Sequence, residues 1–248
     1  MQEFDGFRIL VTGASSGIGA AIAIGFGRRG AAVACHYNGN ADGAAATVAA
    51  IESGGGSAFA LQADLTRRGA ATAIVAEASA RLGGLDVLVN NAGDMRERKA
   101  LADIDGDDLD LNVRPTLAAC RAAIPLLAPG RGSIINMTSI SVRLGATQGG
   151  NLYAASKGFI ASYTRGLARE LAPRTIRVNA IAPGIIDTPL HARRTDPAAF
   201  ARFKDTIPLG RVGLAEDCTG AALYLASPTL AGYVTGQTIE VNGGLSLT

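Results

Sequence analysis

The chain has 248 residues, of which 48% are hydrophobic and 18% are charged, and its 23 Lys and Arg nearly balance its 21 Asp and Glu. This composition is typical of one or two globular domains and excludes disordered and fibrous proteins. The net charge of +2 comes from scattered residues rather than a basic stripe, which argues against nucleic acid or an anionic membrane as partner. We therefore expect small-molecule partners, with no nucleic acid and no membrane.

The cysteines, the histidines and the N-terminal residues argue against three further classes: disulfide-rich, metal-binding and membrane proteins. Cys35, Cys120 and Cys218 are odd in number, lie far apart and form no CxxC pair, so we interpret them as buried small residues rather than disulfide partners or zinc ligands. His36 and His191 lack metal-ligand spacing, which predicts no metal site. The first residues are polar, and no apolar run approaches the roughly 20 residues that span a bilayer. We expect a cytoplasmic protein.

Short apolar or β-branched runs alternate with alanine-rich helical patterns along the whole chain. This alternation predicts βαβ units, and therefore an α/β fold with a doubly wound, seven-stranded parallel sheet of the Rossmann type, in a single domain of residues 1–248. The expected strands are Arg8 to Thr12, Ala31 to Tyr37, Ser57 to Gln62, Leu85 to Asn90, Ser133 to Met137, Ile176 to Ile181 and Gln237 to Val241. The expected helices are Ile18 to Arg29, Ala41 to Ser53, Arg67 to Leu82, Pro115 to Leu127, Leu152 to Leu171 and Glu216 to Ala226.

A glycine-rich turn, TGASSGIG, follows the first strand and leads into the first helix. Gly13 permits the tight turn, Gly17 lets the backbone approach a pyrophosphate, and Gly19 lets the helix pack closely on the sheet. The N-terminus of the helix favours an anion. Since a strand precedes the turn and a helix follows it, the pattern favours dinucleotide binding over a plain glycine-rich turn.

Tyr153 and Lys157 are four residues apart in a helical pattern, so they lie on one helix face about one turn from each other. A cation about 5 Å away, at an effective dielectric constant of about 20, contributes roughly 3 kcal/mol and would lower the pKa of a phenol by about 2 units. We therefore expect Tyr153 to be an acid/base group and Lys157 to lower its pKa. The alternative is a surface contact between the two side chains.

The longest stretch that fits no strand or long helix runs from Gly184 to Gly213, and loops of this length in compact domains are usually functional. We interpret it as a substrate lid, at about 184–213. Its Arg193 and Arg194 either bind a phosphate or carboxylate or are solvated side chains of a loop.

Four motifs in chain order resemble the short branch of the short-chain dehydrogenase/reductase family: TGASSGIG, NNAG at 90–93, YAASK at 153–157 and PG at 183–184. The resemblance covers nearly the whole chain. It implies an NAD(P)(H)-dependent oxidoreductase that transfers a hydride between nicotinamide and a secondary alcohol or ketone. Within the family the chain is most similar to 3-oxoacyl-(acyl-carrier-protein) reductases, which act on acyl thioesters, with sugar and polyol dehydrogenases as the alternative. The resemblance also implies a homotetramer, with one interface formed by the helices that contain Asn112 and Tyr153 and another by the C-terminal strand region.

The same resemblance assigns catalytic roles. Ser139 is similar to the family's catalytic serine, with Ser141 as a rival, because the stretch between serine and tyrosine looks longer here than is usual. Asn112 is similar to an asparagine that anchors a proton relay, and its alternative role is capping a helix. The segment between Gly93 and Asn112 looks shorter than the family's, which predicts that its helix starts late or is distorted. The expected catalytic residues are Asn112, Ser139, Tyr153 and Lys157.

The end of the second strand lacks the acidic residue with which NAD-preferring members bind the ribose hydroxyls. Tyr37 stands there and Asn38 follows, so we expect a small preference for NADP(H) over NAD(H). His36 either contributes a partial positive charge or merely ends the strand. The expected cofactor-binding residues, several of them implied by the resemblance, are Gly13, Ser15, Ser16, Gly17, Ile18, Gly19, Tyr37, Asn38, Asp64, Leu65, Asn90, Ala92, Gly93, Tyr153, Lys157, Pro183, Gly184, Ile186 and Thr188.

Other functions fit the sequence less well. A non-catalytic dinucleotide-binding module has no physical reason to retain a tyrosine with a lysine one turn away. An epimerase or dehydratase of the family's longer branch would need room for a separate substrate domain. Arg131 and Arg174, just before the fifth and sixth strands, either meet an acidic acyl-carrier protein or serve the fold.

Overall fold

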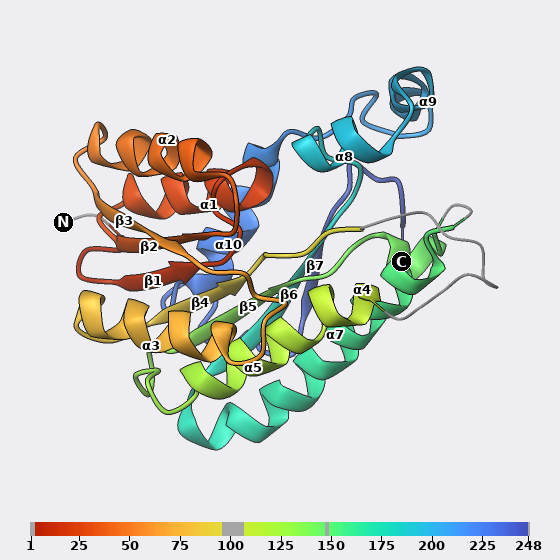
Figure 1. Cartoon of the computed structure of the whole chain (residues 1–248). Helices are drawn as coiled ribbons and strands as arrows, with labels where there is room; N and C mark the ends of the chain where they lie inside the picture. The colour runs from red at the N-terminus through yellow and green to blue at the C-terminus, as the bar shows by residue number, and fades with distance from the viewer. Residues whose placement is uncertain (1–2, 96–106, 147–148, 248) are drawn as a thin grey trace.

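The computed structural model describes residues 3–95, 107–146 and 149–247, and their strands form one parallel sheet (Figure 1). Its seven strands run in the order β3-β2-β1-β4-β5-β6-β7, which confirms the predicted doubly wound α/β fold. The strands are β1 (Arg8–Val11), β2 (Ala32–Tyr37), β3 (Ser57–Gln62), β4 (Val87–Asn90), β5 (Ser133–Met137), β6 (Arg177–Pro183) and β7 (Thr238–Val241). Because the chain order reverses between β1 and β4, a crevice for ligands is expected beyond the carboxyl ends of these strands.

Helices cover both faces of the sheet (Figure 1). One face carries α1 (Gly17–Gly27), α2 (Ala41–Glu52) and α10 (Thr219–Ala226), and the other carries α3 (Ala70–Leu82), α5 (Arg114–Ala123) and α7 (Asn151–Leu171). The strands therefore bury side chains on both faces, as in β5, where every residue is buried. Two hydrophobic cores result, one on each side of the sheet.

The short helices were the elements that the sequence pattern did not predict. The expected lid contains α8 (Pro189–Arg194), α9 (Pro197–Arg202) and the 3-10 turn η3 (Phe203–Asp205). Another short helix, α6 (Ser141–Leu144), follows β5. Each is too short to show a clear helical period in the sequence, although α8 and α9 both begin with a proline, which is pre-organised for a first helical turn.

Three predicted helices differ from the observed ones by more than two residues at one end. The helix expected from Arg67 starts at Ala70, after Gly69 adopts a left-handed conformation with φ of 85°. The helix expected over 115–127 ends at Ala123. The pattern over 216–226 divides into the 3-10 turn η4 (Ala215–Cys218) and α10. A further 3-10 turn, η2 (Ala172–Arg174), follows α7.

Three features of the described residues concern cysteines, metal ligands and membrane-spanning helices. All three cysteines are free and buried. In the described residues, no group of three or more His, Cys, Asp or Glu side chains is placed to hold a metal ion. None of the described helices combines the length and the apolar character that crossing a membrane requires.

Candidate active site

A cavity of about 1140 Å³ lies along the carboxyl edge of the sheet. Its walls come from the turn after β1, the ends of β2 and β3, the segments after β4, β5 and β6, and the start of α8. This volume exceeds the range of about 300–1,000 Å³ usual for small-ligand sites, and so accommodates a dinucleotide together with a substrate. The predicted residues that line it are Gly13, Ser15, Ser16, Gly17, Ile18, Asn38, Asp64, Leu65, Ala92, Gly93, Ser139, Tyr153, Lys157, Pro183, Gly184, Ile186 and Thr188. Four predicted residues do not line it: Gly19, Tyr37, Asn90 and Asn112.

The glycine turn after β1 is closely packed. Gly13 has a φ of 65°, and a Cβ there would stand 3.0 Å from the Ala92 Cα atom. A Cβ on Gly19 would overlap the carbonyl oxygen of Gly13, so Gly19 serves the packing of the turn rather than the cavity wall. Helix α1 begins at Gly17 without a side-chain cap from Ser16, which leaves the N–H groups of its first turn for an anion. The turn therefore fits a pyrophosphate.

Asn91 lines the cavity and was missed by sequence reasoning. Its Nδ2 donates to the carbonyl oxygens of Thr12 at 2.9 Å and Gly13 at 3.1 Å. These bonds tie the end of β4 to the glycine turn. The available signal was a polar residue directly after a fully buried strand. Its neighbour Asn90 instead donates to Asn136 Oδ1 at 2.9 Å, in a buried network below the cavity.

His36 lines the cavity near the glycine turn. Its Nδ1 accepts a hydrogen bond from the Gly13 N–H at 3.1 Å, and its Nε2 lies 3.1 Å from the Ala63 carbonyl oxygen. Burial lowers the pKa of this imidazole below its usual value, so the ring is neutral at pH 7. Of the two alternatives for His36, the structure favours the uncharged one, because the ring is buried and both of its nitrogens have partners.

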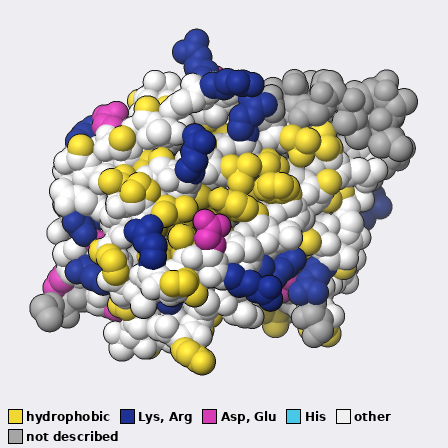
Figure 2. Space-filling model, turned by 90° about the horizontal axis from the view of Figure 1, so that it is seen from below, with side chains coloured by type: hydrophobic (Ala, Val, Ile, Leu, Met, Phe, Trp, Pro, Cys, Tyr) yellow, Lys and Arg dark blue, Asp and Glu magenta, His cyan; other side chains and the backbone are white. Residues whose placement is uncertain are grey.

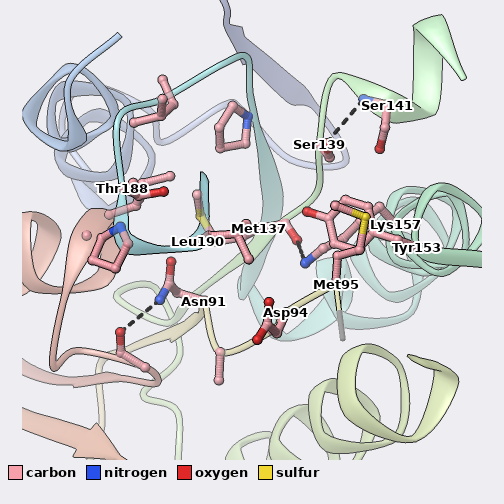
Figure 3. A pocket seen from close by; sticks show the side chains of 18 of the residues that line it. Asn91, Asp94, Met95, Met137, Ser139, Ser141, Tyr153, Lys157, Thr188 and Leu190 are labelled. Atoms are coloured by element: carbon pink, nitrogen blue, oxygen red, sulfur yellow. Dashed lines mark hydrogen bonds between the residues drawn. The ribbon is translucent and has the colours of Figure 1, made fainter. Parts of the chain in front are cut away.

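Tyr153, Lys157 and Ser139 meet in the wall of the cavity (Figure 3). Tyr153 and Lys157 come from α7, and the Lys157 Nζ atom lies 5.7 Å from the centroid of the Tyr153 ring. Lys157 is buried and donates to the Met137 carbonyl oxygen at 3.0 Å. Ser139, after β5, lines the same cavity, and its hydroxyl lowers the pKa of the Tyr153 phenol. A phenol, a hydroxyl and an ammonium group thus converge from two elements.

The pKa of Tyr153 differs from the expectation. Burial raises it to about 12, the hydrogen bond with Ser139 lowers it by less, and the nearby carboxylate of Asp94 adds to the rise. Burial also lowers the pKa of Lys157 to about 8. The prediction that Lys157 depresses the phenol pKa counted the charge of the lysine but not the loss of water around both groups, which acts in the opposite direction. At neutral pH the phenol keeps its proton, which is the state of a proton donor.

The two candidate serines have different contacts. Ser139 Oγ accepts a hydrogen bond from the Ser141 backbone N–H at 3.1 Å, in addition to its bond with Tyr153. Ser141 Oγ is buried and has no hydrogen-bond partner among the described residues. The geometry therefore favours Ser139 as the partner of the phenol.

Asn112 lies behind the cavity wall, at the end of α4 (Asp107–Asn112). Its Oδ1 accepts from the Asp94 N–H at 3.2 Å, and its Nδ2 donates to the Asp94 carbonyl at 2.9 Å. A Cβ on Gly93 would lie 2.6 Å from Asn112 Oδ1 and 3.2 Å from Lys157 Nζ, so a glycine allows these groups to approach. Helices α4 and α5 (Arg114–Ala123) are separated at Val113, two residues before Pro115. Residues 96–106, on which the expected late start or distortion of the helix depends, lie outside the described part of the chain.

The structure describes the side chains of two of the four arginines for which the sequence left alternatives open. Arg131 stacks over the Phe7 ring at 4.1 Å and approaches the buried Asp86 carboxylate at 3.7 Å. Arg174 donates to the Ile124 carbonyl at 2.9 Å. These contacts favour a role in the fold. The side chains of the other two, Arg193 and Arg194, lie outside the described part of the chain.

Comparisons with known proteins agree with this geometry. Residues 13–246 match a family described as enoyl-(acyl carrier protein) reductase. The chain is 40% identical to 3beta-hydroxysteroid dehydrogenase 1 of Eggerthella lenta, over 99% of this chain and 96% of the relative. It is 38% identical to a 3-oxoacyl-[acyl-carrier-protein] reductase of Staphylococcus aureus, over 95% and 96%. A short chain dehydrogenase from Burkholderia cenocepacia, solved in complex with NADP, superposes with a TM-score of 0.91 at 37% identity, over 98% of this chain and 99% of that one.

Proposed function

Because the chain belongs to the short-chain dehydrogenase/reductase family and is an oxidoreductase that acts on CH–OH or C=O groups, we propose that it reduces the ketone of a 3-oxoacyl thioester. The observation that carries this proposal is the convergence of Tyr153, Ser139 and Lys157 in the wall of the cavity that the glycine turn also lines. Reduction of a ketone needs a proton donor at the carbonyl oxygen, and the Tyr153 phenol is one at neutral pH.

The described residues fit a nicotinamide dinucleotide. The first turn of α1 would receive its pyrophosphate, and residues after β3, β4 and β6, among them Asp64, Ala92 and Thr188, would enclose the remainder. When bound, the nicotinamide supplies the hydride to the carbonyl carbon. The residues 184–213 act as the lid over the substrate.

The chain's own side chains handle the proton. Tyr153 donates its proton to the carbonyl oxygen as negative charge develops there, and Ser139 donates a hydrogen bond to the same atom. Lys157 places a positive charge one helical turn away, which favours the tyrosinate that remains after transfer. Asn112 holds the Asp94 backbone and lies beside Lys157, and so positions the group through which the proton is replaced.

The cofactor is proposed to be NADP(H), with a small preference over NAD(H). No acidic residue occurs at positions 37–40, after which α2 begins, so no carboxylate there opposes a 2′-phosphate. The structure solved with NADP supports this choice. Since the neutral ring of His36 contributes no charge, we expect the preference to be modest.

A steroid ketone is a second candidate substrate. The substrate half of the cavity has a largely apolar lining, and the hydroxysteroid dehydrogenase is 40% identical. The apolar side chains are those of Met95, Leu111, Met137, Leu144, Leu190 and Phe203. An apolar wall accommodates either an acyl chain or a fused ring system.

The test is a substrate panel with purified protein. NADPH or NADH is mixed with acetoacetyl-coenzyme A, an acetoacetyl acyl-carrier protein, a 3-ketosteroid and a sugar ketone, and the loss of absorbance at about 340 nm is recorded. We expect the highest kcat/KM on a 3-oxoacyl thioester with NADPH. Preferred turnover of the steroid or sugar would contradict the proposed substrate and leave the oxidoreductase intact.

We also propose that the protein is a homotetramer in the cytoplasm. Hydrophobic side chains gather in the middle of the face that carries α5 and α7 (Figure 2). Phe159 on α7 is 44% exposed and stacks on Tyr163, and Leu109 on α4 is 41% exposed. A second copy would bury these apolar side chains. Light scattering is expected to give four times the chain mass of 25.2 kDa, and a monomer would contradict the proposal.

A further inference from the structure

His36 joins three segments around the cofactor half of the cavity. Its ring accepts from the Gly13 N–H at 3.1 Å and faces the Ala63 carbonyl oxygen at 3.1 Å. Its backbone carbonyl accepts from the Ala14 N–H at 2.7 Å. The side chain is only 2% exposed. One residue at the end of β2 therefore connects the glycine turn after β1 with the segment after β3.

These partners determine which ring nitrogen carries the proton. A carbonyl oxygen only accepts hydrogen bonds, so the Nε2 atom beside Ala63 must be the donor. A backbone N–H only donates, so the Nδ1 atom beside Gly13 must carry no proton. Both bonds exist together only in one neutral tautomer. Protonation of Nδ1 would set two N–H groups against each other and break the bond to the glycine turn.

The bond to Gly13 acts at a crowded point of the cavity. Gly13 has a φ of 65°, and a Cβ on it would stand 3.0 Å from the Ala92 Cα atom. The segment after Ala63 contributes Asp64, Leu65 and Thr66 to the cavity wall. A shift of the turn away from the ring would therefore change the pyrophosphate end of the site. It would also change the spacing between the turn and the segment after β3.

We propose that His36 is a positioning residue for dinucleotide binding, which holds the glycine turn in its binding shape only while the imidazole is neutral. This inference rests on the proposed use of a nicotinamide dinucleotide. It assigns His36 a role that differs from charge recognition of a phosphate. Dinucleotide affinity is then expected to decrease as the pH is lowered, because the imidazole becomes protonated.

The surrounding titratable groups allow this effect to be isolated. The elements packed around the ring carry Cys35 and Tyr37 on β2, Asp42 at the start of α2 and Asp64 after β3. Burial raises the pKa of the Cys35 thiol to about 12. Imidazole is the side-chain type whose ordinary pKa falls between pH 5.5 and 8. Burial lowers the pKa of His36, so the loss of affinity is expected toward the acidic end of that range.

The experiment is calorimetric titration of the full-length protein with NAD⁺ from pH 8 to pH 5. NAD⁺ lacks the 2′-phosphate, whose second ionisation near pH 6 would otherwise obscure the result. The variants are His36→Asn and His36→Leu, which have nearly the same shape. Asparagine keeps an acceptor at the Nδ1 position and does not titrate, whereas leucine removes the acceptor and leaves the Gly13 N–H unpaired.

We expect the wild-type affinity for NAD⁺ to fall about tenfold between pH 8 and pH 5, the size of effect usual for one broken buried hydrogen bond. His36→Asn is expected to bind within about threefold of the wild type at pH 8 and to lose the pH dependence. His36→Leu is expected to bind about tenfold more weakly at every pH.

Two results would overturn the role of His36: a flat wild-type titration, or full affinity in a folded His36→Leu protein. If the leucine variant fails to fold, the wild-type titration and His36→Asn still decide the question. If the wild-type protein binds neither NAD⁺ nor NADP⁺ at pH 8, the proposed cofactor is refuted, and this inference with it.

Discussion

Replacing Tyr153 with phenylalanine is expected to lower kcat about 10³-fold while the Kd for NADPH stays within about threefold. The variant keeps the ring that packs in the cavity wall but removes the proton that reduction requires at the carbonyl oxygen. It also removes the partner of Ser139. Steady-state kinetics on the substrate that the panel identifies, together with calorimetric titration of NADPH, would measure both quantities.

A second tyrosine on the same helix provides the matched control. Tyr163 lies on α7, stacks on Phe159 and does not line the cavity. Tyr163→Phe is therefore expected to retain kcat within about threefold, although it makes the same chemical change as the first variant. More than about a tenth of wild-type turnover in Tyr153→Phe would show that another group donates the proton.

Replacing Ser139 with alanine is expected to lower kcat about 10²-fold, with little change in NADPH affinity. Its hydroxyl is the group that contacts the phenol, and it would donate to the oxygen on which charge develops in the transition state. Ser141→Ala is expected to change kcat less than about threefold, because its hydroxyl makes no hydrogen bond in the described structure. Parallel kinetics of the two variants would rank the serines.

The opposite ranking would reassign the catalytic serine. A large effect of Ser141→Ala with a small effect of Ser139→Ala would mean that substrate binding turns the unpartnered Ser141 hydroxyl toward the carbonyl. Equal losses in both would indicate that both hydroxyls contribute to turnover, because Ser141→Ala leaves the backbone N–H bond from Ser141 to Ser139 Oγ in place.

The order of elements was predictable because it depends on local patterns. Strands such as β2 and β5 are short apolar runs between helices long enough to cross the sheet, and this alternation permits few arrangements other than a parallel sheet. The spacing of Gly13, Gly17 and Gly19 likewise predicted the turn, since each position needs a missing side chain. The four-residue spacing of Tyr153 and Lys157 placed both on one helix face.

Helices too short to show a periodic pattern of apolar residues were not predictable in the same way. Helices α6, α8 and α9 have four to six residues, less than two turns, so no apolar stripe distinguishes them from a loop. Asn91 was missed because its partners, the carbonyls of Thr12 and Gly13, lie 79 and 78 residues away in the sequence.

The sequence by itself determined the fold class, the glycine turn and the pairing of a tyrosine with a lysine, because each follows from the identities and spacing of nearby residues. The tertiary structure decided the chemical state of the site. Burial raises the pKa of Tyr153 despite the nearby lysine, and partners 23 and 27 residues away in the sequence make His36 a neutral link between segments. Protonation depends on solvent exclusion and on contacts between distant segments, and both arise only when the chain is folded.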